Sequence, residues 1–145
     1  IEPLALVLHF CNTDEDRNKW VVYDCVMNIA EGQIVEQKSF KANTYKMLLA
    51  GFQWRSLEKG HSLKLIFKFY MEGNLVYTSV QDAVTNGPDS KDIFQQDFEV
   101  SSSMRLEGPN GITSPFPAGR YEVELYLKTE ELDEHFVMRR TLDVG

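Results

Sequence analysis

Apolar and polar residues alternate along most of this chain of 145 residues. The alternation is clearest between Arg120 and Lys128, where one tyrosine, one valine and two leucines occupy every second position and charged residues fill most of the others. Successive side chains of an extended chain point to opposite faces. A period of two therefore predicts a half-buried β-strand in this segment.

The same period predicts about eight strands. They cover residues 4–11, 19–29, 33–40, 60–71, 75–80, 97–106, 119–128 and 136–144. Polar or glycine-containing turns separate most of them, and a long loop is expected from residue 81 onward. Because strands and helices do not alternate, this order favours a single all-β domain, an antiparallel β-sandwich or a barrel, with the sandwich preferred.

One segment departs from the period of two. Tyr45 and Leu48 recur at helical spacing. Asn43 can cap a first helical turn, and Gly51 follows where such a helix would end. The sequence therefore predicts one short helix over residues 43–50.

Composition and charge narrow the class of protein. Hydrophobic residues make up 43% of the chain and charged residues 26%, as in ordinary globular domains. The net charge of −7 disfavours nucleic acid as a partner, because phosphate binding needs a concentrated basic surface and Arg139-Arg140 is the only adjacent basic pair. No apolar run reaches the ~18 residues of a membrane-spanning helix, so no transmembrane segment is expected.

Two cysteines, Cys11 and Cys25, bear on the cellular compartment. If the strands around them form a hairpin across residues 12–18, Cys25 lies near Ala5, about 20 Å from Cys11 at about 3.3 Å per residue. A disulfide needs Cα atoms within about 7 Å, so both thiols are expected to be free. Free thiols favour a reducing compartment such as the cytoplasm. The chain begins at Ile1 rather than Met, so a processed N-terminus stays open.

The stretch Gly119-x-Tyr121-x-Val123 resembles the entry to the penultimate strand of immunoglobulin-like and fibronectin type III-like domains. In those folds a tyrosine at this point hydrogen-bonds back to the preceding corner of the chain. The resemblance covers roughly the last 30 residues and implies a β-sandwich but no function. The sequence departs from the antibody pattern at Val123, where a cysteine would stand, and at Pro117, where an aspartate is usual.

Asp14, Asp16 and Asn18 have the alternating oxygen spacing of a calcium loop. The glycine of the sharp turn and the glutamate at the twelfth position are missing, so a solvated hairpin turn fits this segment better. A C2-like module that binds calcium and lipid stays an alternative, with Asp89 and Asp92 as further ligands if the loops converge. No metal and no other cofactor is expected.

No motif in the sequence predicts catalysis. His9, His61 and His135 are isolated along the chain, without the close pairing of many zinc sites. The chain has no G-x-S-x-G and no glycine-rich phosphate loop. An enzyme is therefore not expected, although a small β-fold enzyme with a site assembled from loops stays an alternative.

Tyr70 and Tyr126 lie off the main apolar period of their strands, among charged residues. An aromatic ring on a charged sheet face can stack on a sugar or anchor a protein partner, whereas cross-strand packing is the simpler interpretation. With Arg120 and Lys128 they form the candidate binding surface. The sequence thus favours a non-catalytic protein-interaction or structural module with a protein partner. A carbohydrate-binding module is an alternative, and the oligomeric state stays open.

Overall fold

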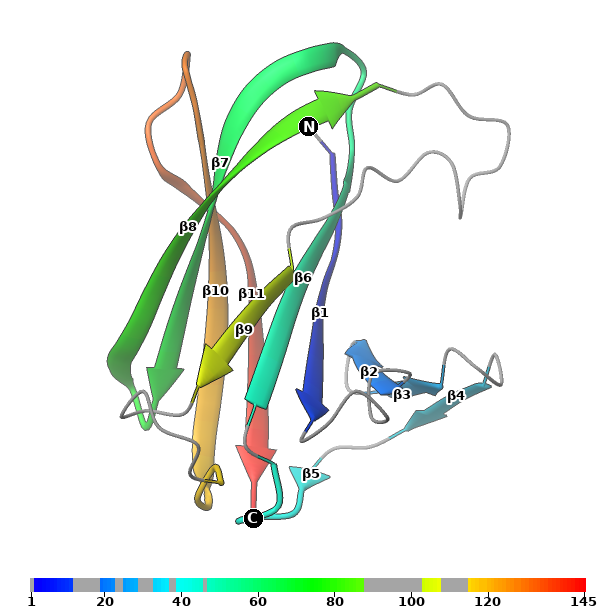
Figure 1. The fold of residues 1–145 in the computed structure, drawn as a ribbon, viewed down its shortest axis with the longest axis vertical. Coiled ribbons are helices and arrows are strands. Elements are labelled where there is room, and N and C mark those ends of the chain that lie inside the picture. Colours follow the sequence, from blue (N-terminus) through cyan, green and yellow to red (C-terminus); the bar gives the residue numbers. More distant parts are fainter. Residues whose placement is uncertain are drawn as a thin grey trace.

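The computed structural model describes residues 2–11, 19–22, 25–28, 33–36, 39–45, 47–87, 103–107 and 115–145. This part of the chain is all-β, with two sheets around one core (Figure 1). The six-stranded sheet contains, in spatial order, β4 (Gln33–Glu36), β3 (Cys25–Asn28), β2 (Lys19–Val22), β1 (Glu2–Cys11), β6 (Met47–Arg55) and β9 (Ser103–Glu107). The five-stranded sheet contains β5 (Ser39–Phe40), β11 (His135–Val144), β10 (Gly119–Thr129), β7 (Lys59–Met71) and β8 (Asn74–Asn86). The all-β class expected from the sequence is confirmed.

The long hairpin of β7 and β8 forms as the sequence predicts. Met71 lies opposite Asn74, so only Glu72 and Gly73 make the turn. Their φ angles of 50° and 81° lie in the left-handed region, which a two-residue hairpin turn of the favoured type requires. β10 pairs antiparallel with β7 on one side and with β11 on the other, so the clearest strand of the sequence lies inside the five-stranded sheet.

One face of each sheet packs into a shared apolar core. The largest buried side chains are Leu6, Leu8, Leu48, Phe52 and Trp54 from the six-stranded sheet, and Leu65, Phe67, Phe69 and Leu125 from the five-stranded sheet. On β6, the rings of Phe52 and Trp54 stack with centroids 5.5 Å apart. Full burial of one such side chain contributes about 1.5–3 kcal/mol, so this layer holds the two sheets together.

The helix expected over residues 43–50 is wrong, because β6 begins at Met47 and its strand occupies the second half of that segment. Only a short turn precedes β6, with Asn43 in the left-handed region at a φ of 57°. Leu48, Ala50, Phe52 and Trp54 are all buried, which is the period of a strand. β6 pairs with β1 on one side and with β9 on the other, and this pairing satisfies its backbone in the extended form.

Two of the predicted strands are divided in the structure. The segment 19–29 forms β2 and β3, which pair with each other so that Val22 lies opposite Cys25. The segment 33–40 forms β4 and β5, and β5 joins the other sheet. β8 continues to Asn86, into the segment expected to be a loop. The described residues therefore form eleven strands rather than about eight.

The strand pairing changes the expected position of Cys25. This residue lies opposite Val22 of β2, and Val21 lies opposite Leu8 of β1. Cys25 is therefore two strands from β1 rather than on the adjacent strand, and its Cα is roughly 16 Å from that of Cys11 by standard strand spacings. That separation is too long for a disulfide, so the prediction of two free thiols stays in place.

Tyr121 fixes the entry of the chain into β10. Its hydroxyl donates to the carbonyl oxygen of Pro117, four residues earlier, at 2.9 Å. Its buried ring lies against the ring of Phe116 in a T-shaped arrangement, with centroids 5.4 Å apart, and burial raises the pKa of the hydroxyl. The Phe116 amide donates to the Tyr45 carbonyl at 2.7 Å and ties this corner to the turn before β6. The backbone contact expected from the sequence is present.

Candidate functional site

The face of the five-stranded sheet that points away from the core is called the outer face. Strand register arranges its side chains in rows that cross the sheet. The apolar row contains Val80, Ile66, Tyr126 and Phe136, from β8, β7, β10 and β11 in turn. The neighbouring charged row contains Thr78, Lys68, Glu124 and Arg139 from the same strands. Three of the four sequence-predicted surface residues lie in or beside these rows.

Glu124 lies at the centre of the charged row and is buried although it is on the outer face, with 8% of its side chain exposed. Arg139 donates from Nη2 to Oε2 of Glu124 at 2.7 Å, and the Tyr126 hydroxyl donates to Oε1 at 3.2 Å. The Nε of Arg139 also pairs with Oε1 of Glu122 at 2.6 Å. A buried carboxylate is tolerated when its oxygens are paired in this way. Glu124 thereby fixes the side chains around it.

Tyr70 completes this arrangement from β7, and Glu124, Arg139, Tyr70 and Tyr126 are together called the Glu124 cluster. Hydrogen bonding to Glu124, with burial, raises the pKa of Tyr70 to about 12. Burial opposes ionisation of Glu124, but hydrogen bonds from Arg139 and the two tyrosines outweigh it and hold the pKa of Glu124 below its ordinary value. At neutral pH the cluster therefore contains an ionised carboxylate and protonated phenols.

The apolar row is exposed at both ends. Ile66 in its centre is 6% exposed, whereas Val80 and Phe136 are 55% and 49% exposed. The rings of Tyr126 and Phe136 meet in a T-shaped arrangement, with centroids 5.7 Å apart. Lys68 Nζ lies 4.1 Å from the centroid of the Tyr126 ring. Aromatic and cationic groups held in this way form a surface that needs little reordering on binding.

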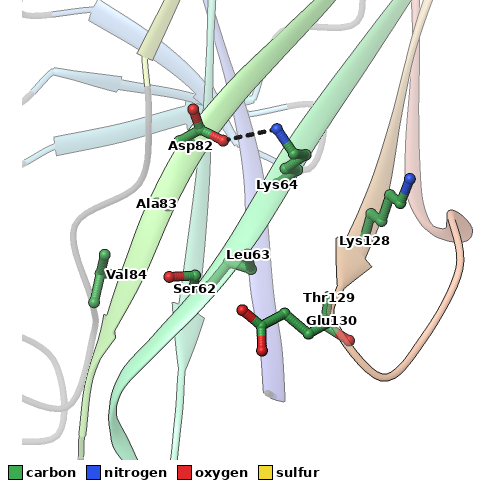
Figure 2. A pocket seen from close by; sticks show the side chains of 9 residues that line it. All are labelled: Ser62, Leu63, Lys64, Asp82, Ala83, Val84, Lys128, Thr129 and Glu130. Atoms are coloured by element: carbon green, nitrogen blue, oxygen red, sulfur yellow. Dashed lines mark hydrogen bonds and ion pairs between the residues drawn. The ribbon is translucent and has the colours of Figure 1, made fainter.

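A pocket of about 410 Å³ opens beside the apolar row, where β7 and β8 continue past the end of β10 (Figure 2). Lys64 Nζ donates to Oδ1 of Asp82 at 3.1 Å, and this pair lies at the top of the pocket as drawn in Figure 2. Lys128 points away from the pair. The Glu130 side chain extends toward β7. The remaining lining residues are Ser62, Leu63, Ala83, Val84 and Thr129. Two cations and two carboxylates balance, so the pocket suits an apolar side chain better than a strongly charged ligand.

The four surface residues predicted from the sequence are not all brought together. The Tyr126 hydroxyl bonds to the Glu124 carboxylate, the same carboxylate raises the pKa of Tyr70, and Lys128 lines the pocket. Arg120 lies at the far end of β10, where its backbone N–H donates to Oε1 of Glu72 at 2.7 Å. The candidate surface therefore runs from the Glu124 cluster to the pocket and leaves Arg120 outside.

Three residues that complete this surface were not predicted from the sequence: Glu124, Arg139 and Phe136. The sequence did contain an indication for Glu124. Residues two positions apart on a strand point to the same face, so Glu124 and Tyr126 are expected to lie on one face. Phe136 lies opposite Tyr126 because the register of β10 and β11 shifts by one residue between Leu125 and Tyr126. A shift of this kind turns a side chain to the other face and leaves no mark in the sequence pattern.

The calcium candidates Asp14, Asp16 and Asn18 lie outside the described residues, as do Asp89 and Asp92. Within the described ranges, no group of three or more histidine, cysteine or acidic side chains is arranged to hold a metal ion. No helix in this part of the chain has the length and hydrophobicity to cross a bilayer. No protein-family model and no curated protein matches the chain.

Proposed function

We propose that this chain is a non-catalytic protein-interaction module that binds a protein partner through the outer face of the five-stranded sheet. The observation that supports this most directly is the apolar row, which ends in half-exposed Phe136 and Val80 beside the charged row. Protein interfaces are enriched in aromatic residues and arginine, and a few such residues supply most of the binding energy. Tyr126, Phe136 and Arg139 are residues of these types, and they are adjacent.

The Glu124 cluster supports the proposal because it orders these side chains in advance. The carboxylate binds the Arg139 guanidinium and the Tyr126 hydroxyl, and the Arg139 Cζ lies 5.3 Å from the centroid of the Phe136 ring. Immobilising a long side chain on binding costs about 0.5–1.5 kcal/mol. Side chains that are already fixed avoid much of this cost, so the cluster favours tight contact with a partner.

An immunoglobulin-like arrangement forms part of the proposal, and two observations support it. One sheet places β1, β6 and β9 side by side, and the other places β11, β10, β7 and β8 side by side. Immunoglobulin domains divide their strands in a similar way, with the last two strands and an earlier central strand adjacent. The Tyr121 hydroxyl bonds to the preceding corner, as in those domains. β2, β3 and β4 would then be an addition between the first two strands of such a fold.

A small-molecule site is the second candidate, because the pocket volume of about 410 Å³ lies within the range of ligand pockets, about 300–1,000 Å³. None of the described side chains that line it is aromatic, so the pocket offers no ring on which a sugar could stack. The pocket therefore supports an apolar partner side chain entering beside the apolar row better than it supports a carbohydrate.

Photo-crosslinking tests the proposed function. A photoreactive phenylalanine analogue in place of Phe136 should cross-link one discrete protein in an extract of the cells that produce this chain. The same analogue in place of Leu57, which is 85% exposed between β6 and β7, should not cross-link that protein. Identical products at both positions, or none at Phe136, would contradict a binding surface on the outer face.

A further inference from the structure

β8 is the edge strand of the five-stranded sheet, and no described strand pairs with the side of β8 opposite β7. Edge strands of natural proteins are commonly protected by prolines, by several charges or by being short. β8 has thirteen residues, no proline and one charged residue, Asp82, which is already paired with Lys64. Val80 and Val84 are 55% and 53% exposed on its outer face. A β-bulge at Val76, which is a protective feature, lies near the start of β8. Beyond this bulge, the edge therefore has the features of a pairing surface rather than of a protected one.

We propose that β8 pairs antiparallel with β8 of a second copy of this chain, across a two-fold axis at Val80. A two-fold interface uses the same surface of both copies. A residue that precedes Val80 in one copy therefore lies opposite the residue that follows Val80 by the same number of positions in the other copy. The paired span is residues 77–83. The span ends there because β8 has a β-bulge at Val76. Phe69 of β7 lies opposite Tyr77, but the next residue, Tyr70, lies opposite Leu75, so Val76 has no residue opposite it on β7.

The side chains of this span complement themselves in that register. On the outer face, the Thr78 hydroxyl lies beside the Asp82 carboxylate of the second copy and can donate to it. On the other face, the large Tyr77, which is 43% exposed, lies beside the small Ala83 of the second copy. Polar Ser79 lies beside polar Gln81 in the same way. No like charges meet in this arrangement.

Two neighbouring positions of the axis fit less well. With the axis at Asp82, the two Asp82 carboxylates would lie opposite each other, and like charges directly opposite are destabilising. With the axis at Gln81, each Asp82 would lie against Val80 of the second copy, an apolar neighbour that cannot pair with it. With the axis at Val80, the two apolar rows join through Val80 into one continuous stripe across both sheets. Of these three positions of the axis, complementarity favours Val80.

Sedimentation analysis over a range of concentrations, from micromolar to millimolar, tests this proposal. The unaltered chain should form dimers as concentration rises, whereas Val80→Lys should stay monomeric because two ammonium groups would meet at the axis. Val84→Lys is the matched control, with nearly the same exposure on the same strand, and should still dimerise. Circular dichroism should be the same for both variants. Thermal unfolding should also be the same at a concentration low enough for both to be monomeric, because dimerisation itself stabilises the folded chain. Equal values separate loss of pairing from loss of folding.

A cysteine cross-link tests the position of the axis. Val80→Cys should form an intermolecular disulfide under mild oxidation, because opposed Cα atoms of adjacent strands lie about 4.5–5.5 Å apart. Val84→Cys should not, since the two copies of that residue would be about 26 Å apart along the strands. A digest analysed by mass spectrometry identifies the bond. A monomeric unaltered chain at every concentration, or equal cross-linking at both positions, would overturn the proposal. Neither result bears on the cross-linking expected at Phe136.

Discussion

Replacing Glu124 with glutamine should lower the free energy of unfolding by about 1.5–3 kcal/mol, the range for hydrogen bonds to charged groups. The substitution keeps the shape of the side chain but removes the charge that binds the Arg139 guanidinium. Glu122→Gln is the matched control, because Glu122 pairs with the same arginine but has 29% of its side chain exposed. Its loss should be below about 1 kcal/mol, as for other solvent-exposed ion pairs. Denaturant unfolding of both variants gives the comparison, and equal losses would contradict a central role for Glu124.

The pKa values give this prediction a pH dependence. The folded-state pKa of Glu124 is lowered, so its contribution is fully present above the ordinary range of a glutamate and is lost as pH falls through the lowered pKa. Tyr70 behaves in the opposite way, since its pKa is raised to about 12 and its contribution is lost as pH rises through that value. Glu124→Gln should abolish the loss of stability that Glu124 causes at acidic pH. It should also bring the pKa of Tyr70 down toward 10, which an ultraviolet absorbance titration detects. An unchanged Tyr70 titration would show that Glu124 is not its partner.

Replacing Tyr121 with phenylalanine should cost about 1–3 kcal/mol of stability, because the Pro117 carbonyl at the corner before β10 would lose its donor. The ring would still pack against Phe116, so the loss reports on the hydroxyl alone. Tyr77→Phe is the control, because Tyr77 is 43% exposed on the edge strand, and it should change stability by less than about 0.5 kcal/mol. Chemical denaturation decides the comparison. Similar small effects of both substitutions would contradict the structural role of the Tyr121 corner.

The strands that could be predicted from the sequence are those whose order of apolar and polar residues fits a strand and does not fit a helix. β10 alternates strictly between apolar and polar residues, and β7 leads into β8 through a glycine turn, so local chemistry defines both. The segment around β6 has two interpretations, because Tyr45 and Leu48 fit a helical spacing while Leu48, Ala50 and Phe52 fit a strand. Pairing with β1 and β9 decides between them, and those partners are far away in the sequence.

The candidate site was less accessible to sequence analysis than the fold. Parity places Tyr70 and Tyr126 on the polar sides of their strands, but it does not show that β7 and β10 are neighbours. The register of these strands brings both tyrosines to Glu124, and the irregularity before Tyr126 brings Phe136 to its ring. Register depends on which residues reach the core together, so one sequence without a structure leaves it undetermined.

The proposal that the outer face binds a protein is tested most directly with the partner identified by cross-linking. The measurement is the affinity of this partner for two variants of the chain, one altered on the outer face and one altered outside it. Phe136→Ala should weaken binding at least about tenfold, which is about 1.4 kcal/mol, since aromatic residues are enriched in protein interfaces and a few residues supply most of the binding energy. Leu57→Ala, which removes a more exposed apolar side chain outside this face, should leave the affinity unchanged. Titration calorimetry measures both. Equal affinities for the two variants would contradict the proposal that the outer face binds the partner.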